Sequence, residues 1–429
     1  MWIGVDDTDS RSEMCTTYIG FLLSSRFRNG MDSYPRLVRL NPNLPFKTRG
    51  NGAVSLQLNH SGKSRSSELT IGRNEGVDIT IKDTEVFDDA LVYGVLKNLI
   101  GKYAIKNDPH TNPGGVLIKE QIPEDFYYRA LSTEISIGET EKILNKLNAR
   151  IYREGNGRGI IGSAASIAWR RKRVTYELIS YKFPSPEKIS MEIKERIGEI
   201  AESFKSTFNN MDRENGTVCL FPKERTPVIY GIRGINPEDL MKIQDKISLE
   251  FPEYSRNFII FQTNQGTDDH IVNDPETMSE YGSYSFQCTV ADIPRRGEGG
   301  HMKIKVKYGN VLVDLIAFEP SKRFRNYLER LRPGDSMRVY GSMGRGNIKI
   351  EKVIILDQAR IYERRVPECN ICGERMKNNG NLSFVCPECG HIQPPDYIRI
   401  EREDIRGRYE PPVSARRHLS MPWKLEGRI

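Results

Sequence analysis

Apolar and polar residues alternate in short runs through the first part of the chain. Residues 2–5 form an apolar run that becomes acidic at once, as expected of a buried strand that ends at Asp6, Asp7 and Asp9. Thr16–Arg26 has the spacing of an amphipathic helix. Further strands are predicted at 37–40, 53–58 and 174–181. This alternation predicts an α/β or α+β front half.

The mixed pattern continues beyond the first part. Residues 187–206 carry helical periodicity, and Asn236 with Pro237 provides a cap and a first-turn proline for a helix over 237–249. Strands are predicted at 217–221, 228–231 and 257–263.

The character of the pattern then changes to closely spaced strands. A helix-like stretch at 323–332 lies between the third and fourth of them. Five strands with a helix after the third are typical of an OB-fold barrel, here over 282–362. The predicted strands are 283–292, 301–308, 310–317, 336–343 and 347–356.

Four of the seven cysteines lie close together in the region 366–395. They form two C-x-x-C pairs, each followed by a glycine, and this spacing predicts a zinc ribbon with four thiolate ligands. Such a closed site is structural rather than catalytic, and unmetallated or redox-active cysteines are the alternative. The four residues are Cys369, Cys372, Cys386 and Cys389.

The composition is that of a globular protein with a mild excess of basic residues. The net charge is +7 and the pI is about 8.9, which suits a polyanionic partner but is equally typical of a solvated basic surface. No apolar run is long enough to span a bilayer, and the N-terminus lacks the layout of a signal peptide. We therefore expect a cytoplasmic protein with no membrane contact.

Asp6, Asp7 and Asp9 are the best candidates for chemistry. Three carboxylates within four residues repel one another, so a strand end favours them only if a cation offsets their charge. Mg²⁺ prefers carboxylate oxygens and bridges nucleotide phosphates. The alternative is a solvated acidic turn.

Two loops could accompany a nucleotide. In the first, Lys47 and Arg49 could clamp phosphates while Gly50 and Gly52 allow close backbone approach, although the Walker order is absent. An ordinary basic turn is the alternative. In the second loop a helix follows a glycine-rich turn, which favours an anion at the helix N-terminus. That turn is formed by Gly157, Arg158 and Gly159.

Basic residues near the barrel and in the C-terminal tail are candidates for RNA contact. Lys322, Arg323 and Arg325 are placed to reach phosphates. The tail, 396–429, is rich in arginine and proline and reads as an extended segment that becomes ordered on RNA. Its basic motif contains Arg416, Arg417 and His418.

Taken in chain order, these motifs resemble those of the archaeal agmatidine synthetases, which modify tRNA. An acidic N-terminal signature, several glycine-rich turns and the cysteine ribbon carry the resemblance, which covers essentially the whole chain. The segments are 4–10, 14–18, 39–42, 47–52, 111–114, 157–162, 230–234, 318–320 and 414–418, together with the four cysteines.

The resemblance implies an α+β multidomain fold. It implies a kinase-like ATP-binding domain mainly in 1–180 and a ferredoxin-like domain mainly in 181–275, which could be interleaved with the first. The OB-fold, the zinc ribbon and the basic tail (396–429) follow. The implied reaction is phosphorylation of the carbonyl oxygen at carbon two of the wobble cytidine in the CAU-anticodon isoleucine tRNA. Agmatine then displaces the phosphate, and the tRNA reads AUA.

The resemblance also implies roles for particular residues. The three aspartates would hold Mg²⁺ and ATP, Lys47 and Arg49 would contact phosphates, and Thr16 would be the threonine that becomes autophosphorylated. The turn around Arg158 would lie near the nucleotide or agmatine pocket. The OB-fold, zinc ribbon and tail would grip the tRNA, largely at its acceptor end, and no obligate protein partner is implied.

Two other readings remain open from the residues alone. A non-catalytic nucleic-acid-binding protein would explain the barrel and the ribbon but not the acidic cluster. A different ATP-dependent RNA-modifying enzyme would share the same front end.

Overall fold

The computed structural model describes residues 1–46, 50–59, 68–82, 85–184, 189–223, 225–380 and 382–429. Lys47 and Arg49, for which the sequence predicts phosphate contacts, lie outside the described residues. Within the described part of the chain, no helix combines the length and the apolar character needed to cross a membrane.

A single mixed sheet of ten strands organises the first 270 residues. Its main path runs β11-β8-β12-β2-β3-β1-β6-β7, and the β4–β5 hairpin attaches to β12. The strands are β1 (Trp2–Asp6), β2 (Arg36–Arg39), β3 (Gly52–Gln57), β4 (Leu69–Asn74), β5 (Val77–Ile81), β6 (Gly114–Ile118), β7 (Arg150–Arg153), β8 (Thr175–Tyr181), β11 (Val228–Gly234) and β12 (Asn257–Thr263).

The sheet joins an early and a late group of strands at β12, which pairs in parallel with β2 and antiparallel with β4. β2 pairs in parallel with β12, whereas β2–β3 and β12–β8 are antiparallel. Beyond the end of β12, the buried Asn264 side chain continues the ladder: its Oδ1 accepts from the Arg39 N–H at 2.7 Å, and its Nδ2 donates to the Arg39 carbonyl at 2.8 Å. The two groups of strands therefore form one body.

Helices cover both faces of this sheet. The pair α1 and α2 closes one face over a core that runs from β1 to β12, while the opposite face carries two separate cores, one under α3–α5 and one under α6–α7. The bounds are α1 (Thr16–Arg26), α2 (Asp89–Tyr103), α3 (Glu124–Ser132), α4 (Ile137–Lys146), α5 (Gly159–Ala168), α6 (Met191–Glu202) and α7 (Pro237–Glu250). A small ribbon, β9 (Met211–Asp212) with β10 (Thr217–Val218), lies beside them.

Several predicted elements are confirmed to the residue or nearly so. α1 and β12 have the predicted bounds, and the Asn236 side chain caps α7 with Pro237 in its first turn, as predicted. α6 is shorter than predicted, because the Ser190 side chain caps it from Met191 and it ends at Glu202.

Glycines let α5 lie directly on the sheet. A Cβ added at Gly114 of β6 would sit 2.1 Å from the backbone nitrogen of Ile160, and one added at Gly4 of β1 would sit 2.5 Å from the carbonyl oxygen of Ser163. At the other end of the helix, buried Arg36 donates to the carbonyls of Ile167 at 3.2 Å and Trp169 at 2.9 Å, which satisfies the last turn.

The predicted five-stranded barrel is confirmed. Its strands pair in the order β14-β18-β19-β17-β16, and a β14–β16 pairing closes the ring. The predicted helix between the third and fourth barrel strands is α8. The bounds are β14 (Ser283–Val290), β16 (Met302–Tyr308), β17 (Val311–Ala317), α8 (Arg323–Glu329), β18 (Ser336–Gly344) and β19 (Asn347–Asp357), with β13 (Ile271–Asn273), β15 (Arg295–Arg296) and β25 (Gly407–Tyr409) at the edges.

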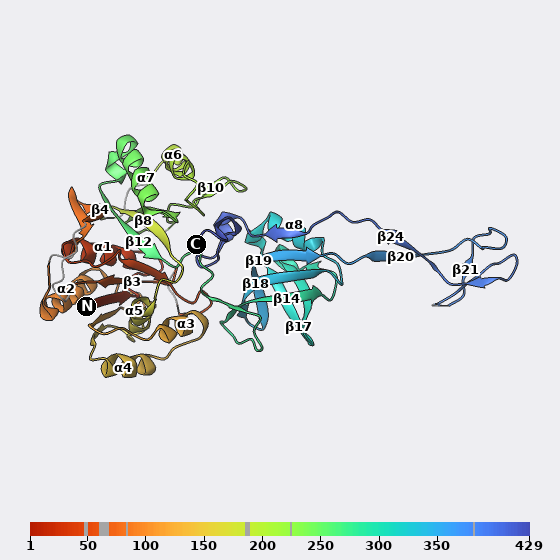
Figure 1. Ribbon diagram of the computed structural model, residues 1–429, viewed down its shortest axis with the longest axis horizontal. Coiled ribbons are helices and arrows are strands. Elements are labelled where there is room, and N and C mark those ends of the chain that lie inside the picture. The colour runs from red at the N-terminus through yellow and green to blue at the C-terminus, as the bar shows by residue number, and fades with distance from the viewer. Residues whose placement is uncertain (47–49, 60–67, 83–84, 185–188, 224, 381) are drawn as a thin grey trace.

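A two-stranded arm extends from the barrel and carries the cysteine region to the far end of the molecule (Figure 1). The small core of the cysteine region consists of Cys369, Met376, Phe384 and Cys386. The strands of this region are β20 (Ile361–Arg365), β24 (Asp396–Ile400), β21 (Lys377–Asn378), β22 (Phe384–Val385) and β23 (Ile392–Gln393).

The C-terminal tail is folded onto the protein, which differs from the prediction of a segment ordered by RNA. β25 pairs with β19, and the chain end lies between the sheet body and the barrel (Figure 1). Leu419 and Leu425 are buried there, and the carbonyl of His418 accepts from the N–H of Gly266 at 2.8 Å. These few apolar side chains anchor the tail, although its overall composition is polar.

The tight approach of α5 to β6 gives a stability prediction. Gly114→Ala should lower the free energy of unfolding by about 2 kcal/mol or more, because the new methyl group meets backbone that cannot move aside cheaply. Gly94→Ala is the matched control: Gly94 lies within α2 with nothing near its Cβ position, and alanine there should stabilise by about 0.5–1 kcal/mol. Thermal unfolding measures both variants, and equal shifts would contradict the packing argument.

Candidate active site

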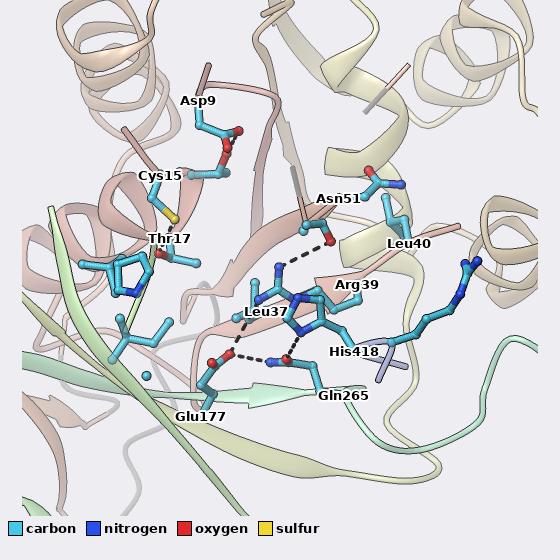
Figure 2. Close-up of a pocket in the computed structure, with 18 of the residues that line it drawn as sticks. Asp9, Cys15, Thr17, Leu37, Arg39, Leu40, Asn51, Glu177, Gln265 and His418 are labelled. Atoms are coloured by element: carbon cyan, nitrogen blue, oxygen red, sulfur yellow. Dashed lines mark hydrogen bonds and ion pairs between the residues drawn. The ribbon is translucent and has the colours of Figure 1, made fainter. Parts of the chain in front are cut away.

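One cavity of about 500 Å³ opens beside the junction between the two groups of strands. It brings together residues far apart in the sequence: the end of β1, the start of α1 and α5, the loop before β3, residues 217–223 and the tail. Figure 2 shows Asp9, Cys15, Asn51 and His418 around this cavity. Of the predicted site residues, the cavity is lined by Asp6, Asp7, Asp9, Thr16, Gly50, Gly52, Arg158, Gly159, Arg416, Arg417 and His418.

The acidic end of the cavity is built by the turn that follows β1. Asp7 has a left-handed backbone (φ 56°), and its Oδ2 accepts from the N–H of Asn112 at 3.1 Å. The Thr111 hydroxyl donates to the Asp9 carbonyl at 2.8 Å, and the Thr16 hydroxyl donates to the Asp9 carboxylate at 3.5 Å. The turn thus holds the predicted phosphate acceptor, Thr16, beside Asp9.

The electrostatics of this end favour a cation. Burial, reinforced by the charge of Asp7, raises the pKa of Asp6 well above its usual range. Burial and the charge of Asp9 raise the pKa of Asp7 to about 7, although the Asn112 N–H and the Arg158 charge act to lower it. Carboxylates that are costly to ionise alone become favourable beside a positive ion.

The aspartates do not form a compact coordination set. Among the described residues, the only group of three or more histidines, cysteines and carboxylates with ligand atoms within 4.8 Å of one another is the cysteine cluster. Mg²⁺ ordinarily takes only one or two carboxylates and completes its shell with water and substrate phosphates, so the donor set at this end fits that ion.

Gly162 of α5 makes room for the Asp6 side chain, and the glycine-rich turn before α5 does not present bare N–H groups. A Cβ added at Gly162 would lie 1.8 Å from Asp6 Oδ2. The N–H of Gly159 already donates to the Asn112 carbonyl at 2.9 Å, and that of Ile160 to the Gly157 carbonyl at 3.3 Å. The anion-binding role predicted for this turn therefore rests on the side chain of Arg158.

Arg158 lies between two groups at the cavity wall. Its guanidinium lies 4.0 Å from the ring centre of Phe46 and 3.3 Å from the carboxylate of Glu134. Both Arg158 and Phe46 line the cavity, whereas Gly157, with φ 76°, belongs to the turn behind it.

The opposite end of the cavity contains a charged cluster that the sequence reasoning missed. Glu177 of β8 is 3% exposed and lies 3.8 Å from Arg39 and 3.4 Å from Arg233. Gln265 also donates to Glu177, and its Oε1 lies 3.0 Å from Nδ1 of His418 (Figure 2). The available signal was a single carboxylate within an otherwise apolar strand pattern.

A glycine again gives the carboxylate its space. A Cβ added at Gly231 of β11 would lie 2.8 Å from Oε1 of Glu177. Gly231 and Arg233 belong to a motif at 230–234 that the sequence marks without assigning a role. The structure gives it one, since the motif supplies both the gap and a cation for Glu177.

The tail closes the cavity between these two ends. Arg416 donates to Asn209 at 2.8 Å and pairs with Glu410 at 2.8 Å. Arg417 donates to Asn43 at 2.8 Å. The residues predicted to contact RNA from a free tail therefore line the cavity, where their guanidinium and imidazole groups already have partners.

The basic residues of the barrel do not reach this cavity. Lys322 and Arg323 are exposed on the barrel, and Lys322 pairs with Glu319 at 3.1 Å. Arg325 differs from its prediction as a phosphate contact, because it is 8% exposed and its guanidinium donates to the carbonyl of Gly300 and to Glu319. Its charge ties α8 to the loop before β16.

The four cysteines converge as predicted for a metal site. Sγ–Sγ distances are 3.5 Å for Cys369–Cys389, 3.4 Å for Cys372–Cys386 and 3.7 Å for Cys372–Cys389. Four thiolates about 2.3 Å from one zinc ion would lie about 3.8 Å apart, so the cluster fits Zn²⁺. The glycine after each pair has a left-handed backbone, φ 78° and 69°, as the predicted turns require.

The chain combines a charged cavity in a mixed α/β body with a closed barrel and a cysteine cluster. The family domain described as "TiaS TCKD domain" matches residues 2–156, and the "TiaS FLD domain" matches residues 157–270. A protein of Thermoplasma volcanium described as TiaS, the 2-agmatinylcytidine synthetase of the isoleucine-2 tRNA, is 40% identical, with 99% of this chain and 97% of the relative covered. The chain therefore belongs to the TiaS family.

Solved structures agree over nearly the whole chain. The crystal structure of TiaS in complex with the isoleucine-2 tRNA and ATP superimposes with a TM-score of 0.81 at 34% identity. A complex of TiaS with the same tRNA, AMPCPP and agmatine superimposes with a TM-score of 0.80 at 31% identity. Each comparison covers 98% of this chain and 96% of the other.

The cysteine cluster gives a metal prediction. Protein purified without chelator should contain about one equivalent of zinc, and Cys372→Ser should lower the zinc content and speed hydrogen exchange within 367–395. The cause is that the core of this region is too small to remain folded without the metal. Elemental analysis and hydrogen-exchange mass spectrometry measure the two effects. Ser383→Ala in the same region is the control, and an equal effect of both substitutions would contradict the prediction.

Proposed function

We propose that this protein uses ATP to attach agmatine to carbon two of the wobble cytidine of the CAU-anticodon isoleucine tRNA. The observation that carries the proposal is full-length similarity to TiaS proteins, some of which have been solved with the isoleucine-2 tRNA, ATP, an ATP analogue and agmatine. The cavity supports it, since it combines acidic and basic groups in the space of one mixed-sheet body.

The acidic end is the nucleotide site in this proposal. Asp6, Asp7 and Asp9 would hold Mg²⁺, which when bound would neutralise phosphate charge during transfer. The Thr16 hydroxyl, hydrogen-bonded to Asp9, would receive a phosphoryl group in the autophosphorylation implied for the family. Phosphate contacts would come from Lys47, Arg49, Gly50 and Gly52, with Arg158 and its turn beside the nucleotide or agmatine.

The chemistry proceeds in two balanced steps. The γ-phosphoryl group of ATP passes to the oxygen on carbon two of the cytidine, and ADP leaves. The primary amine of agmatine then attacks carbon two, the carbon–oxygen bond breaks, inorganic phosphate leaves, and the amine loses a proton. The oxygen is a poor leaving group until it is phosphorylated, which is why ATP is consumed.

The remaining domains grip the tRNA in this proposal. The barrel has the strand order and helix position of an OB-fold (282–362), and the cysteine region (366–395) would be a zinc ribbon. Lys322 and Arg323 are exposed for phosphate contact on the barrel, whereas Arg325 is committed to the fold. Arg416, Arg417 and His418 would meet the nucleotide inserted into the cavity. The wobble base must leave its stack to enter the cavity, which costs a few kcal/mol. Binding of the tRNA over a large protein surface could offset that cost.

The domain assignment is part of the same proposal. Residues 1–180 would be mainly a kinase-like domain, residues 181–275 mainly a ferredoxin-like domain, and 396–429 a basic tail. Because β11 and β12 hydrogen-bond into the same sheet as β1 and β2, the two front domains would act as one body. We place the enzyme in the cytoplasm, with no protein partner required.

Asp7→Asn tests the nucleotide site. Asparagine tolerates the left-handed backbone of Asp7, so the turn should persist while one carboxylate charge is lost. We expect incorporation of labelled agmatine into tRNA to fall by about 100-fold or more, with the dissociation constant for tRNA unchanged within about threefold. Asp78→Asn, which removes an exposed carboxylate paired with Arg73, is the control. Normal incorporation by the Asp7 variant would remove the catalytic role from this residue.

Thr16→Val tests the proposed phosphate acceptor. Valine keeps the shape of the buried side chain and removes the hydroxyl that bonds to Thr8 and Asp9. We expect no transfer of label from γ-labelled ATP to the protein, whereas Thr16→Ser should retain transfer. Labelling of the valine variant at the wild-type level would show that another residue accepts the phosphoryl group.

Nucleoside mass analysis separates the proposal from its alternatives. Wild-type enzyme with ATP and agmatine should add the mass of agmatine less water to one cytidine of the tRNA. Another added mass would indicate a different RNA modification. No ATP consumption at all would indicate a nucleic-acid-binding protein without catalysis.

A further inference from the structure

A second cluster of buried charge lies outside the cavity, where the barrel meets the sheet body and the tail. It consists of two ion pairs, Glu351 with His270 at 3.0 Å and Lys352 with Asp268 at 2.5 Å. All four side chains are at most 9% exposed. Buried polar and charged groups are costly unless they are paired, so these paired side chains hold the junction in a defined geometry.

A β-bulge brings the two barrel residues to this junction together. In the pairing of β18 with β19, Gly341 is opposite Ile350 and Tyr340 is opposite Lys352, so Glu351 is the extra residue. Neighbouring residues of a regular strand point to opposite faces, but a bulge redirects one side chain. Gly341 permits the bulge, since a Cβ there would lie 2.6 Å from the Lys349 carbonyl oxygen.

The two ion pairs have different tasks. Lys352 donates to the carbonyl of Met421 at 2.7 Å, and Asp268 accepts from the N–H of Met421 at 2.7 Å. This pair therefore fastens the tail and the linker after β12 to the barrel. It makes no contact with a cavity-lining side chain among the described contacts, and its role is structural.

Glu351 points instead toward a residue of the cavity. Its Oε1 accepts from the Ser342 hydroxyl at 2.5 Å and lies 3.5 Å from Nε of Arg417. Burial acts to raise the pKa of Glu351, but His270, Arg417 and Ser342 lower it to about 2, so the group is a carboxylate at neutral pH. Arg417 is 25% exposed, donates to Asn43 on its other side, and lines the cavity.

We propose that Glu351 is a positioning residue for the reaction: from the barrel, it holds the Arg417 guanidinium in place at the wall of the active-site cavity. The inference rests on the proposed function. Arginine has several rotatable bonds, and a carboxylate on one side with an amide oxygen on the other fixes its planar group. A tRNA docked on the barrel would then contact the same rigid unit, which includes Glu351 and orients the Arg417 guanidinium toward the inserted nucleotide.

A double-mutant cycle with agmatine transfer as the readout tests this proposal. Glu351→Gln keeps the size of the side chain and removes the charge that faces Arg417, and Arg417→Gln removes the positioned cation. We expect each single variant to lower kcat about tenfold or more, with Kd for the tRNA within about threefold of wild type. The double variant should lose no more than Arg417→Gln alone, because Glu351 acts only through Arg417.

Ser342→Ala provides a second test that remains usable if Glu351→Gln does not fold. It removes the hydroxyl that orients Glu351 and leaves every charge in place. It should lower kcat several-fold in the wild-type background and leave kcat unchanged in the Arg417→Gln background. Asp274→Asn, which breaks an exposed pair with Arg338 on the same barrel, should leave kcat unchanged in both backgrounds.

The outcomes separate this inference from the proposed function. If wild-type protein transfers no agmatine to tRNA, the proposed function itself is wrong. If the wild type is active and the Glu351 and Arg417 effects add, or if Ser342→Ala lowers kcat equally in both backgrounds, Glu351 has only a structural role. Loss of tRNA affinity in step with kcat would also overturn the positioning role, because it would place the defect in binding.

Discussion

The parallel pairing of β2 with β12 is the constraint on which the rest of the structure depends. Its register places Gln262 opposite Arg36 and Thr263 opposite Leu37, and the side chain of Asn264 extends the ladder to Arg39 with two further hydrogen bonds. A pairing between strands so far apart in the sequence costs chain entropy. The apolar core under α1 and α2, which is continuous across it, offsets that cost.

That pairing is what gives the cavity two chemically different ends. The acidic turn belongs to the early group of strands, and Glu177 with Arg233 belongs to the late group. Arg39 lies at the seam between them and reaches Glu177 at 3.8 Å. Each group alone would present half of a site on an open sheet edge, so the charge pattern of the cavity is a consequence of the sheet order.

The structure accommodates a buried carboxylate in the same way at both ends. Gly162 leaves space beside Asp6, and Gly231 leaves space beside Glu177. A methyl group at either position would crowd a carboxylate oxygen. Glycine-rich motifs in this chain therefore mark close approach to acidic groups as well as turns, which is a different use from the phosphate cradle that such motifs usually suggest.

Local elements were predictable from the sequence, whereas the assembly of the site was not. Periodicity and capping residues gave α1, α7 and the barrel strands because their determinants lie within a few residues. The cysteine spacing gave the cluster for the same reason. The one local mark of Glu177 is that it is a single carboxylate in an otherwise apolar strand, and nothing local distinguishes Arg325 from an exposed phosphate contact. Both roles depend on which strands or loops become neighbours.

The tail shows most clearly why composition misleads at such positions. Its arginines predicted a solvated segment that becomes ordered on RNA. In the structure, Arg416 pairs with Glu410, and Arg417 lies between Asn43 and Glu351. A guanidinium that is already bonded on two sides loses less freedom when a substrate arrives than one that must be ordered at that moment. The tail thus holds cations in place at the wall of the cavity. On the proposed function, these cations would face the tRNA nucleotide inserted into the cavity, whereas the aspartates at the acidic end would face the metal and the phosphates of ATP.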